Sequence, residues 1–206
     1  MKKIIGIILS LTLVLGLCAC GGPTPTEAAN DFMRAIKEQD TETLKTVYAG
    51  GSLDITEDVK KGKGKDEFDE LFGDALYEKL FAFEYEVSNE KIDGDKATVD
   101  VAIKTYGLGT SFTNFVSEFM AQAFSLALSG ASEDAINKMS VEIFSAKLDE
   151  AKLDYEKTVT LNLTKKDNEW VVDELAEDGD FFNAITGGMI EAAKNAENMF
   201  SSGEEK

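Results

Sequence analysis

Residues 81–103 read FAFEYEVSNEKIDGDKATVDVAI, and this stretch decides the fold class. Apolar and polar side chains alternate on both sides of Asp93-Gly94, a pair of residues typical of the turn between two antiparallel strands. The pattern predicts a β-hairpin with one buried face and one face in water. The expected buried side chains are Phe81, Phe83, Tyr85, Val87, Ala97, Val99, Val101 and Ile103.

A second hairpin is expected later in the chain. Its apolar positions are Val159, Leu161, Leu163, Trp170 and Val172, with Asp167-Asn168 as the turn. Because helical periodicity surrounds both hairpins, we expect an α+β fold in which a curved antiparallel sheet is packed against helices.

Helices are predicted before the first hairpin. Thr24, Pro25 and Glu27 have the form of a capping box with proline at the first helical position. The helix that follows carries an apolar stripe of Ala28, Phe32, Ala35 and Ile36. Asp40 can cap a second, short helix with Leu44, Val47 and Tyr48. A third helix is marked by Phe68, Leu71, Phe72 and Leu76.

Between the hairpins, residues 111–150 predict an inserted pair of long helices. The first has an apolar face of Phe112, Phe115, Val116, Phe119, Ala123, Leu126 and Ala127. The second begins at Ser132 as its cap and buries Ile136, Met139, Ile143 and Phe144. Because an apolar helix stripe usually faces a core, we expect the Phe-rich face to pack against the sheet. The alternative is a surface that touches a partner or a membrane.

A last helix is predicted from Asp180 onward, with Phe181, Phe182, Ile185, Met189 and Ile190 as its apolar residues. Gly187-Gly188 lies inside it and predicts a kink or a close contact between the helix and the sheet. Residues 201–206 are a polar tail.

The N-terminus predicts export. Met1-Lys2-Lys3 is positively charged, and the uncharged apolar run from Ile4 to Leu17 is too short to span a bilayer. Leu17-Cys18-Ala19-Cys20 resembles the lipobox of bacterial lipoproteins. The resemblance implies that residues 1–19 are a signal peptide and that Cys20 carries the lipid. We then expect a tether at 20–26, a single α+β domain at 27–199, and a polar tail at 200–206, on the outer face of the cell membrane.

The composition excludes several kinds of site. The chain has no histidine, and its cysteines are Cys18 and Cys20. Histidine-dependent catalysis and zinc sites of histidine or thiolate are therefore excluded from the mature chain. The net charge of −18 argues against nucleic acid as a partner. The basic cluster at 60–65 (KKGKGK) is interpreted as a solvated loop, with anionic lipid or wall polymer as the alternative.

No calcium loop is expected either. Asp93-Gly94-Asp95 and Asp178-Gly179-Asp180 lack the closing glutamate of such a loop, and we interpret them as a turn and a helix cap. We assign no metal, no cofactor and no catalytic residue from the sequence.

The opening helix at 26–36, with Asp40, and the hairpin at 165–173 (KKDNEWVVD) together resemble nuclear-transport-factor-2-like domains. The whole mature chain, including the stretch at 183–189 (NAITGGM), is similar to uncharacterised lipoproteins of Gram-positive bacteria. The resemblance implies a cone-shaped sheet around helices, with a pocket at its open end that the pair at 111–150 would fill or cover.

Two functions fit these residues. The first is a non-catalytic domain, anchored by its lipid, that binds a protein partner or a small apolar ligand. The second is an enzyme like the isomerases and dehydratases of that fold, with a pocket carboxylate and a tyrosine. The candidate tyrosines are Tyr48, Tyr85, Tyr106 and Tyr155.

Overall fold

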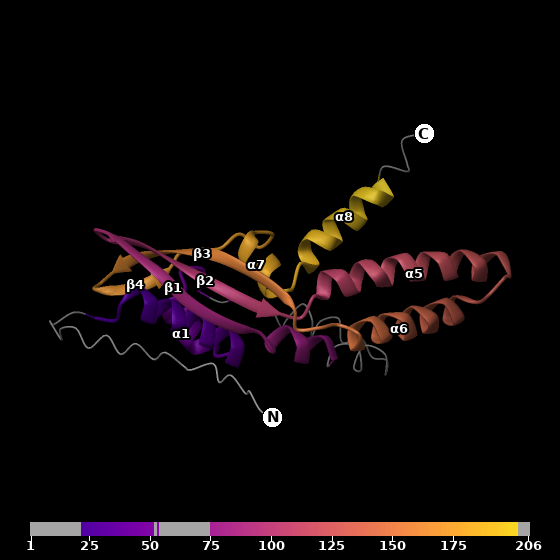
Figure 1. Ribbon diagram of the computed structural model, residues 1–206, viewed down its shortest axis with the longest axis horizontal. Coiled ribbons are helices and arrows are strands. Elements are labelled where there is room, and N and C mark those ends of the chain that lie inside the picture. Colours follow the sequence, from indigo (N-terminus) through magenta and orange to yellow (C-terminus); the bar gives the residue numbers. More distant parts are fainter. Residues whose placement is uncertain (1–21, 52, 54–74, 202–206) are drawn as a thin grey trace, which may run out of the picture.

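The computed structural model describes residues 22–51, 53 and 75–201 (Figure 1). The predicted signal peptide, Cys20, the basic cluster at 60–65 and most of the predicted third helix lie outside the described residues.

The centre of the fold is a four-stranded antiparallel sheet in the order β1-β2-β3-β4. Its strands are β1 (Glu84–Asp93), β2 (Lys96–Thr105), β3 (Tyr155–Lys166) and β4 (Glu169–Val172). Both predicted hairpins are confirmed. Asp93 pairs with Lys96 across the first turn, and Asp167 and Asn168 form the second with φ angles of 51° and 72°.

The predicted start of the first strand is wrong by three residues. Residues 75–81 are helical, so Phe81 ends a helix and β1 begins at Glu84. Phe81 packs beside the buried Leu76 and Leu80, and its ring lies 4.8 Å from that of Tyr77, four residues earlier on the same helix. The alternation of apolar and polar residues continues through residues 81–83, so it does not show where the strand begins.

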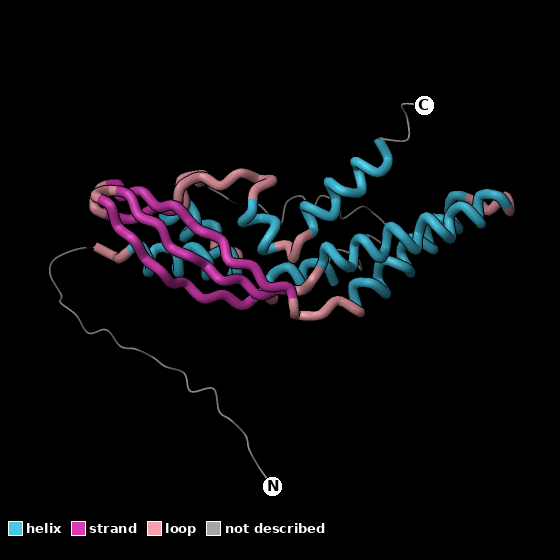
Figure 2. The backbone as a smooth tube through the Cα atoms, turned by 45° about the horizontal axis from the view of Figure 1, so that its top comes forward, coloured by secondary structure: helices cyan, strands magenta, loops and turns pink. Residues whose placement is uncertain are grey.

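One face of the sheet forms the core with helices α1 (Pro25–Glu38), α2 (Thr41–Val47) and α7 (Asp180–Ile185). The expected apolar residues of β2, β3 and β4 are all buried. The opposite face carries polar side chains in water. Figure 2 shows the twisted sheet with helices behind it. The chain therefore has the predicted α+β class.

The helix starts follow their capping residues. Thr24 accepts a hydrogen bond from the backbone N–H of Glu27, and the Glu27 carboxylate accepts one from the N–H of Thr24, which completes the predicted capping box. Asp40 accepts from the N–H groups of Glu42 and Thr43 at the start of α2. Helix α1 begins at Pro25, inside the segment 20–26 that we expected to be a tether.

The inserted pair is a helical hairpin that extends away from one end of the sheet (Figure 1). It consists of α5 (Leu108–Leu128) and α6 (Glu133–Asp149), with Ser132 as the predicted cap of α6. The expectation that the Phe-rich face packs on the sheet is wrong. Phe115 makes an edge contact with Phe144 of α6 at 5.2 Å between ring centroids, because the hairpin supplies its own second helix as cover.

This hairpin has a core of its own at its base. The buried side chains of that core are Leu76, Leu80, Leu108, Phe144 and Leu148. Phe112, Phe115 and Met189 pack on it while half-exposed. Within the described residues, no helix is long and apolar enough to cross a bilayer.

The predicted last helix is interrupted at Gly187-Gly188, where α7 ends and α8 (Met189–Ser201) begins (Figure 1). Gly187 has a φ of 60°, and a Cβ placed on it would lie 1.9 Å from the carbonyl oxygen of Tyr106. The N–H of Gly109 donates to the carbonyl of Gly187 at 2.9 Å. The glycine pair thus provides the predicted kink, and its close contact is with Tyr106 and the start of α5 instead of a strand of the sheet.

Gly187→Ala is expected to lower the free energy of unfolding by more than about 2 kcal/mol. A left-handed backbone costs an alanine about 1–2 kcal/mol, and the contact with Tyr106 adds strain to this cost. Urea denaturation followed by circular dichroism measures the loss. Gly94→Ala is the matched control, because Gly94 has a φ of 62° but no atom within 4 Å of its Cβ position. Equal losses in the two variants would contradict the close contact at Gly187.

Candidate functional site

The interior of the sheet, where the fold resemblance placed a pocket, is filled with side chains. Phe32 of α1 is fully buried and its ring lies 5.3 Å from that of Tyr48 and 5.6 Å from that of Phe181. Among the described residues, the buried polar side chains are Thr105 and Ser111, so none of the described carboxylates is buried. A desolvated general base of the kind that the enzyme hypothesis requires is therefore missing from the described interior.

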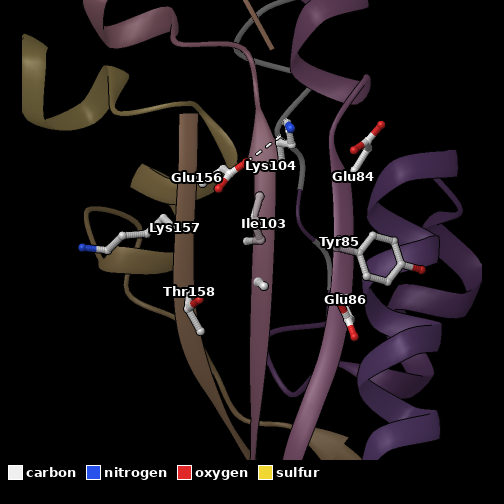
Figure 3. A pocket seen from close by; sticks show the side chains of 9 residues that line it. Glu84, Tyr85, Glu86, Ile103, Lys104, Glu156, Lys157 and Thr158 are labelled. Carbon is white, nitrogen blue, oxygen red and sulfur yellow. Dashed lines mark ion pairs between the residues drawn. The ribbon is translucent and has the colours of Figure 1, made fainter. Parts of the chain in front are cut away.

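A shallow hollow of about 410 Å³ lies on the water-facing side of the sheet (Figure 3). Its side chains on that side are Glu84, Glu86, Ala102, Lys104, Glu156 and Thr158. They meet there because Lys104 is paired with Glu84 on one neighbouring strand and with Glu156 on the other. Lys104 and Glu156 form an ion pair at 3.2 Å, with both side chains largely in water. Exposed pairs of this kind contribute little energy and are typical of a solvated sheet face.

Tyr85 borders the same hollow but does not complete an acid–base pair there. Its ring lies toward α1 in Figure 3, and its hydroxyl donates to the carbonyl of Asn30 at 3.4 Å. Burial raises the pKa of Tyr85 above its usual value. The tyrosine hydroxyl and the carboxylates of the hollow therefore belong to opposite faces of β1.

The other candidate tyrosines have separate places. The buried Tyr48 hydroxyl accepts from the N–H of Leu175 at 3.1 Å, and the ring of Tyr106 lies under the Lys79 ammonium. Tyr155 lines a crevice of about 290 Å³ between α5 and α8, together with Glu191. Burial first, and then the charges of Glu191 and Asp180, raise the pKa of Tyr155. Tyr155 and Glu191 in this crevice resemble the carboxylate–tyrosine pair of the enzyme hypothesis. The crevice is open to solvent, however, and Glu191 is exposed.

The polar face of the sheet also holds a small hydrogen-bonded group around Asp100. Thr160 donates to one carboxylate oxygen at 2.8 Å and Asn89 to the other at 3.0 Å. These two hydrogen bonds, that of Thr160 first, lower the pKa of Asp100. The carboxylate of Asp100 is therefore held by neighbouring polar side chains on an exposed sheet face. The described part of the chain contains no group of three or more acidic, histidine or cysteine side chains placed to hold a metal ion.

The two Asp-Gly-Asp sequences have the local roles that were predicted. Asp93-Gly94-Asp95 forms the end of the first hairpin, and Gly179 is the N-cap residue of α7. Asp178 is paired with Lys194 of α8 at 2.9 Å, which lowers the pKa of Asp178.

The α5 stripe, which we define as Met120, Phe124 and Leu128, is the most apolar exposed feature of the described chain. Their exposed fractions are 50%, 71% and 75%. At a spacing of four residues they lie on one side of α5, away from the side on which Phe115 meets α6. Lone exposed apolar side chains are common, but three in a row along a helix form a contiguous patch.

The segment of the chain that carries the α5 stripe has no charged residue. From Phe119 to Ser132, at the tip of the hairpin, the sequence contains no acidic or basic residue, although 29% of the whole chain is charged. The closest charged contact toward the base of the hairpin is the pair of Glu118 with Lys147 of α6, at 2.9 Å. The α5 side of the tip is therefore uncharged and apolar, whereas the exposed Glu133 and Asp134 follow in the first turn of α6.

Sequence reasoning identified the apolar face of α5 that packs on α6 and missed the α5 stripe. The signal was present as the four-residue spacing of Met120, Phe124 and Leu128. It was hidden because α5 is apolar on both sides in its second half. The structure does not bring the candidate tyrosines together into one site, and the predicted lipid site Cys20 lies outside the described residues.

Comparisons with known proteins give one distant likeness. No family model matches the chain, and no curated protein matches it. Among solved structures, it is similar to YcdA of Bacillus subtilis, provisionally described as a lipoprotein, with 17% identity and a TM-score of 0.38. The match covers 84% of this chain and 48% of the other, so the chain spans about half the length of that protein.

Proposed function

We propose that this chain is a lipid-anchored, extracytoplasmic binding protein without catalytic activity, and that the tip of its α5–α6 hairpin contacts a protein partner. The anchor is Cys20, preceded by the signal peptide 1–19. The tether 20–26, the domain 27–199 and the tail 200–206 follow it. The N-terminal sequence supports the anchor, and the described structure supports the binding surface.

The observation that carries the binding role is the exposure of the α5 stripe. Large apolar side chains gain no stabilisation while they are exposed to water. They have a role at such a position if a partner covers them. Exposed apolar patches of this kind mark interaction sites. Three adjacent apolar side chains on a rigid helix resemble the anchors by which one helix binds another protein.

A protein partner fits this surface better than a small apolar ligand. Small-molecule sites are concave and enclose most of the ligand surface. The described interior is packed around Phe32, whereas the α5 stripe is convex. The enzyme alternative lacks a buried carboxylate in the described residues and is left with the open crevice at Tyr155.

Photo-crosslinking in cells tests the binding role. A photoreactive phenylalanine analogue replaces Phe124 in the full-length chain, and the control places it at Asn137, an exposed residue of α6 on the same hairpin. We expect a discrete adduct from position 124 that is absent at position 137. Adding Leu128→Ser to the Phe124 variant should lower the adduct yield several-fold.

Two results would overturn the proposal. The first is the same set of adducts from both positions, which indicates non-specific collisions. The second is an adduct with the mass of two copies of the chain, which indicates self-association instead of a different protein partner.

A further inference from the structure

The start of the described chain is fixed to the turn end of the sheet, which we define as residues 91–96 and 164–169. Gly22 lies so close to the β3–β4 turn that a Cβ placed on it would be 2.7 Å from the carbonyl oxygen of Asn168. The N–H and the hydroxyl of Thr26 donate to the same carboxylate oxygen of Glu90, at 2.8 and 2.6 Å. The start of the described chain therefore contacts both hairpins, β3–β4 through Gly22 and β1–β2 through Thr26.

A bulge in β1 makes the second contact. The pairing of β1 with β2 shifts between Ser88 and Lys91, and Asn89 has a φ of 55°. A bulge redirects the side chain that it carries. Here Glu90 reaches from the bulge to the first turn of α1, where a negative charge is favourable next to the free N–H groups of the helix.

Cys20 precedes Gly22 by two residues, so its Cα lies within about 7 Å of that of Gly22. Whatever is attached to Cys20 is therefore next to the turn end of the sheet. The α5–α6 tip is at the other end of the molecule, as Figures 1 and 2 both show. Strand β2, with 10 residues, runs from the turn end into α5, with 21 residues, and together they extend about 60 Å at the usual rise per residue.

The charge of the turn end suits a bilayer surface better than the rest of the chain does. Its four lysines balance its four carboxylates, whereas the whole chain has a net charge of −18. The lysines are Lys91, Lys96, Lys165 and Lys166, and the acids are Asp93, Asp95, Asp167 and Glu169. Ile92 is 55% exposed within it. An end without net charge approaches anionic headgroups without repulsion, and an exposed isoleucine gains energy at the interface.

We infer that the turn end of the sheet is a membrane-contacting surface, with Ile92 at the headgroup layer, and that the domain stands upright with its tip about 60 Å from the bilayer. This inference rests on the proposed lipid at Cys20. It means that the α5 stripe is beyond the reach of the membrane that carries the protein. The stripe therefore meets its partner in the space above that membrane.

Energy transfer from single labelled cysteines to the membrane tests this orientation. In the mature chain Cys20 is the only cysteine, so Asp95→Cys and Ser129→Cys each give one labelling site, both at exposed positions. The natively processed, membrane-extracted protein carries a donor dye and is added to preformed vesicles of phosphatidylglycerol and phosphatidylethanolamine with an acceptor lipid. We expect strong quenching at position 95 and little at position 129.

Two further variants test the contacts that the orientation requires. Ile92→Glu should reduce the quenching at position 95 while the protein still floats with the vesicles. Glu90→Ala, which removes the contact with Thr26, should make the quenching at the two positions more alike.

The outcomes separate this inference from the proposed anchor. Equal quenching at the two positions, or stronger quenching at 129, in protein that floats with the vesicles overturns the upright orientation and leaves the anchor intact. Quenching at 95 that Ile92→Glu does not change overturns the Ile92 contact. Protein that does not float overturns the anchor and the orientation together.

Discussion

Cys20→Ala is expected to remove fatty-acid labelling completely and to move the protein from the membrane fraction to the soluble fraction. The proposed lipid is the attachment that the N-terminal sequence predicts, and no helix in the described residues is long and apolar enough to cross a bilayer. Each buried methylene of an acyl chain contributes about 0.8 kcal/mol to membrane binding, and two chains are needed for a stable anchor. The contact at the turn end is too small to replace such an anchor.

Metabolic labelling with an alkyne fatty acid, followed by fractionation of the cells, measures this result. Cys18→Ala is the matched control, because Cys18 is in the segment that the proposed processing removes. The control should keep its label and its place in the membrane fraction. A Cys20→Ala protein that is still labelled would show that the lipid is on another residue or that the anchor is wrong.

Phe32→Ala is expected to lower the free energy of unfolding by about 3–5 kcal/mol, the usual loss for a buried phenylalanine. Phe32 is fully buried between α1 and the sheet and contacts the rings of Tyr48 and Phe181, so its removal leaves a cavity at the centre of the core. Domains of this size are stable by about 5–15 kcal/mol, so this loss is a large part of the total.

Phe124→Ala is the matched control for this measurement, because it removes the same atoms from a side chain that is 71% exposed. We expect a change within about 0.5 kcal/mol. Urea denaturation of the two variants gives both values. If Phe124→Ala were as destabilising as Phe32→Ala, the α5 stripe would belong to the folding core and could not be free for a partner.

The parts of the fold that were predicted correctly depend on local sequence. Alternation along β2 and β3 identifies a strand with one buried face, and the turns at Gly94 and at Asn168 need the left-handed backbone that glycine and asparagine tolerate. The caps of α1 and α2 are short-range hydrogen bonds between residues two or three apart. Each of these features can be recognised without knowing what lies across the core.

The direction of the α5–α6 hairpin could not be predicted in this way. An apolar stripe shows that one side of a helix is covered, but it does not say by which element. Phe115 could have packed on the sheet, and it packs on Phe144 because the short turn at the tip brings α6 alongside. For the same reason, the sequence did not distinguish the covered Phe115 from the exposed Phe124.

The features of the candidate site also divide into those set by local sequence and those that depend on tertiary contacts. The N-terminal pattern that predicts lipid at Cys20 is contiguous, so the sequence alone suggests it. The α5 stripe is recognised because no other described element covers it. The turn end is recognised by the contact of Gly22 with Asn168, which is far along the chain. Relations of that kind require the tertiary structure.

The junction of Gly109 with Gly187 gives the hairpin a mechanical property. Backbone packs directly against backbone there, and the N–H of Gly109 donates to the carbonyl of Gly187 at 2.9 Å. The hairpin extends about 30 Å from this contact, so a small change of angle at the pair of glycines produces a large displacement at the tip. A change of about 10° in the angle at this contact corresponds to a displacement of the tip of about 5 Å over that length. In the proposed orientation, the angle of the chain at this glycine contact therefore sets where the partner-facing tip lies relative to the anchored base.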